Sequence, residues 1–443
     1  MNTPICDFVK NYIASGTLRL HMPGHKGEGA LGFEALDITE IAGADVLYSA
    51  EGIIAESQRN ASALFGSGAT FFSCEGSSHA IRAMLCLTRF YCGEERPLVL
   101  AGRNAHKAFM GAASLLDLDV DWLCDEDGSL LSCRISAETL ERRLSEMERK
   151  PAAVYITSPD YLGNIADIAA LSAVAHRHGA LLLVDNAHGA YRHFLPVACH
   201  PLDLGADMCA DSAHKTLSAL TPCAYLHIGK DAPPELCEQA MRALELFATT
   251  SPSYLLLQSL DMTNKVLAEG YREELAACCE RVGRLKEKLL SHGFALRGEE
   301  PIKVTLAPKS FGYTGAELAQ YLRENGVECE FADPDFAVLM FTPAITAQQT
   351  EKVAQLLTAL SGKAPSEETQ PPVGTVKRAM SIRAASFARS EVLRVEDCLG
   401  RVLAEANVSC PPAVPIVACG EVIDEAAVRA LRYYGVEECR VVK

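Results

Sequence analysis

The sequence predicts an α/β fold with a mostly parallel sheet and helices on both of its faces. Between about residues 68 and 230, short apolar runs alternate with longer segments of helical periodicity. The apolar runs are continuous rather than interrupted by polar residues, which is typical of parallel strands buried on both faces. The chain has 443 residues, of which 49% are hydrophobic and 22% charged, so it is long enough for two or three domains with substantial cores.

One βαβ unit shows the pattern clearly. Residues 151–159 (PAAVYITSP) and 180–189 (ALLLVDNAHG) have the composition of buried strands. Between them, residues 167–179 predict a helix with Asp167 at its start and Gly179 as its C-cap. Because strands joined by a crossover helix run in the same direction, we expect the two strands to be parallel.

The flanking segments extend this architecture. Residues 136–150 (SAETLERRLSEMERK) predict a helix with Ser136 as its N-cap and Pro151 closing it. Residues 301–362 give the order strand, helix, strand, strand, helix, which predicts a separate and smaller α+β domain. The polar, proline-rich stretch that follows predicts a linker before a last unit that begins near residue 375.

Charge and cysteine usage exclude several classes of function. The net charge of −16 argues against nucleic acid or an anionic membrane as a partner. The N-terminus has no basic, apolar signal peptide, and no apolar run reaches the roughly 18 residues of a membrane span. The 17 cysteines are scattered and form no CxxC pair, so we expect reduced thiols, no metal site and a cytoplasmic location.

A phosphate site is predicted after the strand at residues 69–74 (ATFFSC). Gly76 permits a tight turn, and Ser77 and Ser78 place two hydroxyls where a helix begins. Backbone amides and hydroxyls at a helix N-terminus bind anions well. The alternative is that these serines only cap the helix, as serines often do.

Two further polar positions follow buried strands. Asp185 ends the strand LLLVD, and Lys215 follows the apolar run at residues 204–210. Each has a structural alternative, a capping carboxylate for Asp185 and a surface lysine for Lys215. Together with the phosphate site they fit pyridoxal 5′-phosphate, which needs an anion site, a Schiff-base lysine and a carboxylate that keeps its ring nitrogen protonated. Ser212 and His214, beside Lys215, are further candidates for the phosphate.

A histidine supplies the last element of this hypothesis. His106 follows the strand RPLVLAG, and we expect it to lie against the pyridine ring and to supply a proton. The alternative is a structural histidine with no contact to the cofactor.

The chain resembles a short form of the ornithine/lysine/arginine decarboxylase family, within the fold type I group of pyridoxal-phosphate enzymes. The resemblance covers nearly the whole chain and rests on ordered segments: HMPGHKGEG (21–29), DITEIAGADVL (37–47), ESQRNASALFGS (56–67), RNAHKAF (103–109), DNAHGAYRHF (185–194), GADMCADSAHKTLSALTPCAYL (205–226), TTSPSYLLLQSLD (249–261) and CPPAVPIVACGEVID (410–424).

The resemblance implies roles for particular residues. Lys215 is then the Schiff-base lysine and Asp185 the partner of the ring nitrogen, with His106 stacked on the ring. His188 is expected near the cofactor's substituents, and Glu421 is a candidate to bind a cationic substrate side chain. The phosphate ligands carried over are Ser77, Ser78, Ser212 and His214. For Glu421 the alternative is an acid favoured by the dipole at a helix start.

The resemblance also implies an organisation and an assembly. We expect a homodimer or a larger homo-oligomer, because the family's sites take residues from two subunits. The expected parts are an N-terminal segment at the dimer interface (1–50), a large cofactor-binding domain (51–290), a small α+β domain (291–362), a linker (363–374) and a C-terminal decarboxylase-type domain (375–443).

The implied reaction is decarboxylation of a small basic amino acid (arginine, lysine or ornithine) to an amine of the kind used in polyamine biosynthesis. Three departures from the family pattern concern the substrate side: Asn186 replaces an acid, Cys410 and Ala413 replace Tyr and Gly, and the segment GADVL (43–47) keeps one acid of a pair. Two alternatives therefore stay open. One is another fold type I reaction such as transamination, for which Arg383 and Arg389 are available to hold a carboxylate. The other is a protein that binds the cofactor without turnover.

Overall fold

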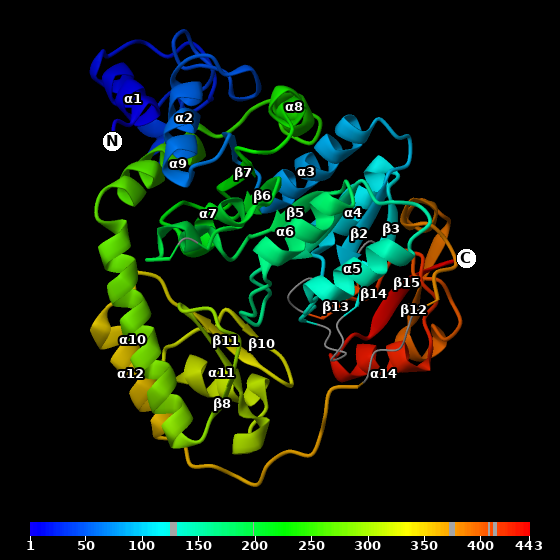
Figure 1. Ribbon diagram of the computed structural model, residues 1–443. Coiled ribbons are helices and arrows are strands. Elements are labelled where there is room, and N and C mark those ends of the chain that lie inside the picture. The colour runs from blue at the N-terminus through cyan, green and yellow to red at the C-terminus, as the bar shows by residue number, and fades with distance from the viewer. Residues whose placement is uncertain (125–130, 198, 372–376, 406–407, 411–413) are drawn as a thin grey trace. The chain divides into compact units, whose positions relative to one another are not determined.

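The computed structural model describes residues 1–443 except 125–130, 198, 372–376, 406–407 and 411–413, and it leaves out the side chains of 408–410. Two compact units are present (Figure 1). The first comprises Met1–Glu94, Ala152–Val154 and Ile168–Arg272, and the second comprises Glu95–Pro151, Tyr155–Asp167 and Glu273–Lys443.

A seven-stranded sheet with the order β1-β7-β6-β5-β4-β2-β3 is the main element of the fold. Its strands are β1 (Ala69–Ser73), β2 (Leu98–Gly102), β3 (Asp119–Leu123), β4 (Ala153–Thr157), β5 (Leu181–Asp185), β6 (Met208–Asp211) and β7 (Ala224–Ile228). The pairs β5/β6 and β2/β3 are parallel, whereas β7 runs antiparallel to both β6 and β1. The predicted α/β class with a mostly parallel sheet is confirmed.

The directions of the strands determine which of their carboxyl ends lie at the same edge of the sheet. Because β7 is antiparallel to both β1 and β6, these two strands point the same way, and β5 is parallel to β6. The carboxyl ends of β1, β5 and β6 therefore lie at one edge of the sheet. In open sheets of this kind, ligands bind beyond the carboxyl ends of the strands.

Helices surround the first unit's part of the sheet. They are α1 (Pro4–Ala14), α2 (Ile53–Phe65), α3 (Ser77–Cys92), α6 (Ile168–Arg177), α7 (Ala213–Thr216), α8 (Pro234–Glu245) and α9 (Tyr254–Ala268). Helix α3 packs along β6 and β7 and against α8 (Figure 1). The predicted βαβ helix forms as α6, and Gly179 adopts a positive φ of 72° just beyond its end.

One buried carboxylate ties the N-terminal helix to this unit. Asp261 on α9 accepts hydrogen bonds from the backbone N–H groups of Ile5 and Cys6, both at 3.0 Å, and from the Ser57 hydroxyl at 2.6 Å. The carboxylate thereby satisfies first-turn amides of α1 and favours the positive end of that helix. Burial raises the pKa of Asp261 even though these bonds oppose it.

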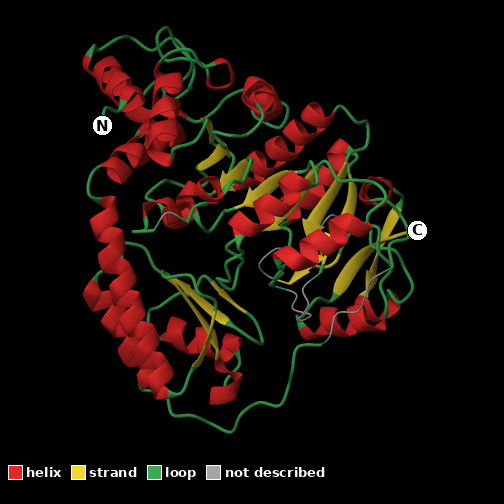
Figure 2. Ribbon diagram, in the orientation of Figure 1, coloured by secondary structure: helices red, strands yellow, loops and turns green. Residues whose placement is uncertain are grey.

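The second unit contains a four-stranded antiparallel sheet with the order β10-β11-β9-β8. Its strands are β8 (Ala295–Arg297), β9 (Lys303–Ala307), β10 (Phe331–Ala332) and β11 (Ala337–Met340), and its helices are α10 (Tyr271–His292), α11 (Gly315–Glu324) and α12 (Ala347–Thr358). Helix α11 packs against β10 and β11 (Figure 2). An ion pair between Lys288 and Glu351 joins α10 to α12. Strand β8 is not anticipated by the sequence pattern, because it has only three residues and none of them is buried.

The remaining elements of this unit lie on either side of that sheet in the sequence. They are α4 (Lys107–Leu116), α5 (Ala137–Glu146), α13 (Ile382–Ser386), β12 (Ser390–Arg394), β13 (Val408–Cys410), β14 (Val414–Val417), α14 (Glu425–Tyr433) and β15 (Glu438–Val442). Strands β12/β15 and β13/β14 form two small antiparallel pairs. Residues 363–371, within the expected linker, form neither helix nor strand. The rest of that linker, 372–374, lies outside the described residues.

Helix α5 shows where a local prediction was right and where it was not. Ser136 is the N-cap, as predicted, and its hydroxyl accepts a hydrogen bond from the Thr139 N–H at 3.1 Å. The helix ends at Glu146 rather than near Pro151. Lys150 donates from its Nζ to the Leu144 carbonyl at 2.5 Å, which satisfies one of the carbonyls left at the helix end.

Two findings concern the whole described part of the chain. Its sixteen described cysteines are all free thiols, in agreement with the reduced state expected from their scatter. Among the helices that the structure describes, none combines the length and apolar character needed to cross a membrane.

Candidate active site

A helix N-terminus with two hydroxyls forms the predicted anion-binding part of the site. Gly76 precedes α3 with a φ of 81°, a left-handed conformation that favours glycine. Because glycine has no side chain to cap the helix, the first amides of α3 stay available to a ligand. Ser212 donates from its Oγ to the Oγ of Ser77 at 2.7 Å, so two hydroxyls from different strand ends meet at this N-terminus.

Lys215 lies in the short helix α7, which follows β6. Its Nζ is 3.1 Å from Nε2 of His188, and the His188 side chain is buried. An ammonium has only donors, so the histidine nitrogen is the acceptor in this contact. The structure thus joins two predicted site residues that are 27 positions apart in the sequence.

Asp185 is the last residue of β5 and is only 3% exposed. Its Oδ1 accepts a hydrogen bond from the Ala187 N–H at 3.2 Å. The next side chain, Asn186, points away from this bond and donates to Asp211 at 2.6 Å. Asp185 therefore lies as a buried acid at the same sheet edge as Lys215.

His214 is placed differently from its neighbours. Its Nδ1 donates to the carbonyl oxygen of Cys223 at 3.0 Å. Since that nitrogen holds a proton for the carbonyl, the ring can offer an N–H to a phosphate only when Nε2 is protonated as well. The phosphate role of His214 stays a prediction with this condition attached.

Two predicted residues lie in the second unit. His106 is the N-cap of α4, and its Nδ1 accepts a hydrogen bond from the Ala108 N–H at 3.1 Å. Glu421 bonds through its Oε2 to Arg103 at 3.0 Å and to the Ala418 N–H at 2.6 Å. The ring-stacking role of His106 and the substrate role of Glu421 stay predictions.

The residues of the first unit fit the chemical needs of pyridoxal phosphate. A phosphate group requires donors, and the amides of Ser77 and Ser78 with the Ser77 and Ser212 hydroxyls supply them at the positive end of a helix. An aldehyde requires an amine, which Lys215 supplies beside a hydrogen-bond acceptor. A pyridinium requires a buried anion, which Asp185 supplies.

Two of the departures noted in the sequence have a structural account. The Asp45 carboxylate accepts hydrogen bonds from the backbone N–H groups of Val46, Glu51, Gly52, Ile54 and Ala55. It thus organises the N-terminus of α2 rather than facing a ligand. Asn186 is engaged by Asp211, as described above. Ala413 and the side chain of Cys410 lie outside the described residues.

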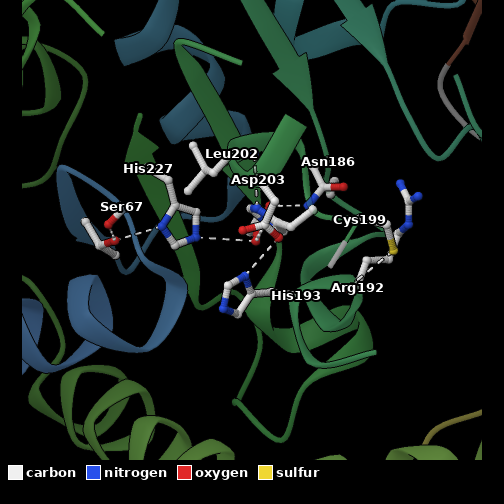
Figure 3. Close-up of polar contacts among 12 residues, drawn as sticks. Ser67, Asn186, Arg192, His193, Cys199, Leu202, Asp203 and His227 are labelled. Atoms are coloured by element: carbon white, nitrogen blue, oxygen red, sulfur yellow. Dashed lines mark hydrogen bonds and ion pairs between the residues drawn. The ribbon is translucent and has the colours of Figure 1, made fainter. Parts of the chain in front are cut away.

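A buried network around Asp211 is the main feature that the sequence analysis missed. Asp211 is fully buried and lies 2.9 Å from Nε2 of His200 and 3.3 Å from Nε2 of His227. Figure 3 shows the His227 ring on the side of Ser67, with Asn186 on the opposite side of the network. A signal was present, because Asp211 ends a buried strand, which is the same reason that singled out Asp185.

Comparison with known proteins identifies the family. A family model described as Orn/Lys/Arg decarboxylase, major domain, matches residues 3–308. A protein named arginine decarboxylase from Bacillus subtilis (strain 168) is 29% identical, with 96% of this chain and 91% of the relative covered. A protein of the same name from Bacillus anthracis is 30% identical over 97% of this chain and 92% of its own.

Solved structures show the same fold. The lysine decarboxylase of Francisella novicida superposes with a TM-score of 0.81 at 15% identity, covering 100% of this chain and 81% of that one. Lysine decarboxylase A of Pseudomonas aeruginosa gives 0.80 at 18% identity, covering 97% and 75%. A family match over more than half of the chain, an active-site arrangement that fits the cofactor and a shared fold lead to one conclusion. The chain belongs to the ornithine/lysine/arginine decarboxylase family of amino-acid decarboxylases, in fold type I, and its cofactor is pyridoxal 5′-phosphate.

Proposed function

We propose that this protein decarboxylates a basic amino acid, with arginine tested before lysine and ornithine, and that Lys215 is the lysine that carries the cofactor. The contact of 3.1 Å between Lys215 Nζ and His188 Nε2, at the sheet edge that also bears Asp185, is the observation that carries this proposal. Four relatives of similar length named arginine decarboxylase support arginine as the first substrate to test.

Pyridoxal phosphate supplies a cationic conjugated ring that accepts the electron pair left when the carboxylate leaves the α-carbon. The protein's own residues hold that ring and manage protons. Asp185 keeps the ring nitrogen protonated by Coulomb attraction in a buried setting. Ser77, Ser78 and Ser212 hold the phosphate, which fixes the orientation of the ring and of the bond that breaks.

Lys215 would have a second role as a proton carrier. Its Nζ would hold a proton and deliver it to the substrate's α-carbon. His188 accepts a hydrogen bond from this nitrogen, so it orients the amine and accepts its surplus proton. His106 is the other candidate proton donor. Variants at Lys215 and at His106 distinguish which of the two residues protonates the α-carbon.

Transamination is the competing reaction, and one observation counts against Arg383 as its carboxylate-binding arginine. Aminotransferases hold the substrate carboxylate with an arginine, whereas Arg383 donates to the carbonyls of Ser114 and Leu115 at the end of α4. Its guanidinium also lies 5.1 Å from the ring centre of Phe387. Arg383 is thus engaged in closing a helix end.

We further infer a homodimer that works in the reducing cytoplasm and forms amines of the polyamine type. The dimer is supported by a dense set of exposed apolar side chains in the N-terminal segment. Leu18, Leu20 and Leu31 are 77%, 83% and 72% exposed. Exposed apolar clusters of this kind are typical of protein–protein interfaces. The free thiols support the reducing compartment.

The test is a substrate screen with the purified protein and added pyridoxal phosphate. Arginine, lysine and ornithine labelled in the carboxyl carbon are supplied separately, and labelled CO2 and the amine product are quantified. We expect stoichiometric CO2 and amine from one of them and none with Lys215→Ala. A keto acid formed without CO2 would assign transamination instead. A cofactor spectrum that no basic amino acid alters would assign binding without turnover.

An independent readout tests the role of Lys215 without a substrate. Lys215→Ala should abolish the visible absorbance of the lysine-bound cofactor while the circular dichroism of the folded chain is retained. Lys230, a lysine exposed after β7, offers a matched control, since Lys230→Ala should leave that absorbance unchanged. An unchanged absorbance in Lys215→Ala would refute the assignment.

A further inference from the structure

The Asp211 network lies behind the predicted cofactor site, on the other face of the sheet. In the parallel pair β5/β6, Asp185 is in register with Ala210, so these two side chains share one face. Asn186 and Asp211, each one residue further on, share the opposite face, where Asn186 Nδ2 donates to Asp211 Oδ1 at 2.6 Å. The backbone N–H of Asn186 also bonds to the Ala210 carbonyl at 3.0 Å.

The carboxylate of Asp211 is surrounded by donors. Its other oxygen lies 2.9 Å from His200 Nε2 and 3.3 Å from His227 Nε2, and all three side chains are fully buried. Burial by itself would raise the pKa of Asp211, but the contacts with the two histidines outweigh it and hold this pKa well below its usual range. Asp211 is therefore a buried anion.

A metal ion does not account for these residues. Cys209, His200 and Asp211 place potential ligand atoms within 4.8 Å of one another, which is the spacing of a candidate metal site. However, Nδ1 of His200 accepts a hydrogen bond from the Leu202 N–H, so the ring proton lies on Nε2. A protonated Nε2 donates to Asp211 and cannot ligate a metal.

We propose that Asn186 and Asp211 form a matched amide–acid pair that positions Asp185, with Asp211 acting as a positioning residue through Asn186. The pair joins the carboxyl ends of β5 and β6 by their side chains, directly behind the residue predicted to face the ring nitrogen. The inference rests on the proposed role of Asp185.

The pair also explains why an amide stands at position 186. An acid there would put two carboxylates 2.6 Å apart in a site without water contact, where both cannot be ionised. The orientation of Asn186 is fixed as well, because its Oδ1 has no hydrogen-bond partner among the residues that the structure describes and a flipped amide would turn that oxygen toward the Asp211 carboxylate. The opposite arrangement, an acid at 186 and an amide at 211, preserves every bond.

Because the acid and the amide can exchange positions, the experiment uses three variants: Asn186→Asp, Asp211→Asn, and the double variant with both changes. Each is purified without cofactor, and three quantities are measured: the melting temperature of the apoprotein, the dissociation constant for pyridoxal phosphate, and the visible absorbance and circular dichroism of the bound cofactor. Asp185→Ala serves as the reference for a lost ring-nitrogen partner.

We expect Asn186→Asp to weaken cofactor binding at least tenfold and to shift the spectrum toward that of Asp185→Ala. Asp211→Asn should change binding less than threefold, because the Asn186 amide can flip and accept from the new amide. The double variant should return to within threefold of the parent, since its new amide donates to the new acid and accepts from His200.

Asp207→Asn is the matched control for a merely structural effect. Asp207 is a buried acid just before β6, at the other end of the same strand, and it pairs with His176 at 2.8 Å. This variant should lower the melting temperature and leave the cofactor spectrum unchanged. The proposal is overturned if Asn186→Asp behaves like this control, if the double variant is no better than Asn186→Asp, or if the apoprotein binds Zn²⁺ stoichiometrically through Cys209. If Asp185→Ala itself leaves the spectrum unchanged, the proposed site fails instead.

Discussion

Arg103 and Glu421 form a buried ion pair whose disruption should destabilise the second unit in a pH-dependent way. Arg103 donates to Glu421 Oε2 at 3.0 Å, and to the carbonyls of Pro415 and Ile416 at 2.9 and 3.1 Å. The guanidinium also lies 5.3 Å from the ring centre of Trp122. The perturbation is Arg103→Ala, which removes all of these contacts at once.

The expected loss follows from the burial of the pair. Coulomb attraction between unit charges 3.0 Å apart amounts to about 5.5 kcal/mol at an effective dielectric constant of about 20, most of it offset by desolvation. Removing one partner of a buried pair costs roughly 3–5 kcal/mol, because the other charge stays buried. The Arg103 side chain keeps 16% exposure against 4% for Glu421, so we expect the lower end, about 3 kcal/mol.

The pH dependence has a definite sign. Burial raises the pKa of Glu421 above its ordinary value, although Arg103 and the Ala418 N–H oppose the rise. The unfolded chain therefore releases this proton at a lower pH than the folded protein, and stability falls as the pH rises through the folded pKa. Without Arg103 the folded pKa climbs further, so Arg103→Ala should be more destabilising at pH 8 than at pH 5.

The assay is thermal melting of the holoenzyme at both pH values. A loss of about 3 kcal/mol corresponds to roughly 6–12 °C in a unit of this size. The double variant Arg103→Ala/Glu421→Gln should recover part of the loss at pH 8, since no buried charge remains. Equal melting of Arg103→Ala and the parent, or a loss independent of pH, would refute this reasoning. A rise in KM for arginine in Glu421→Gln at unchanged melting temperature would show that Glu421 serves the substrate instead.

Three further predictions concern other parts of the chain. Ser77→Ala and Ser212→Ala should each weaken pyridoxal phosphate binding roughly 10- to 100-fold, the effect of about 1.5–3 kcal/mol for a hydrogen bond to a charged group, and should leave binding of phosphate-free pyridoxal unchanged. Burial raises the pKa of Asp333 to about 7, so stability should fall between about pH 4 and pH 7, and Asp333→Asn should flatten this profile in melts across that range. Changing Leu18, Leu20 and Leu31 together to Glu should convert a dimer to a monomer in sedimentation velocity, and a monomeric parent would contradict the proposed interface.

Local signals made much of the fold predictable. The strand at residues 181–185 is apolar without interruption because both of its faces are covered, and the Ser136 cap follows from a hydroxyl three residues before an orphan amide. Partnerships across long sequence distances were not predictable. Glu421 is 318 residues from Arg103, and Asp261 is 256 residues from Ile5, so only the folded topology brings them together.

The physical signal that singled out Asp185 as a candidate cofactor residue was also present at Asp211, where the sequence analysis did not use it. Acids rarely end buried strands without a partner, so both Asp185 and Asp211 carry a signal. What separates them is the face of the sheet, and that depends on the register of β5 against β6. Asp185 shares its face with Ala210, the face on which we propose that the cofactor binds, whereas Asp211 shares the opposite face with Asn186 and is engaged by the Asn186 amide and by His200. An acid at the end of a buried strand therefore indicates either a ligand-binding residue or a positioning residue behind the site. The register of the strand pairing decides between the two, because it sets the face of the sheet on which the acid lies.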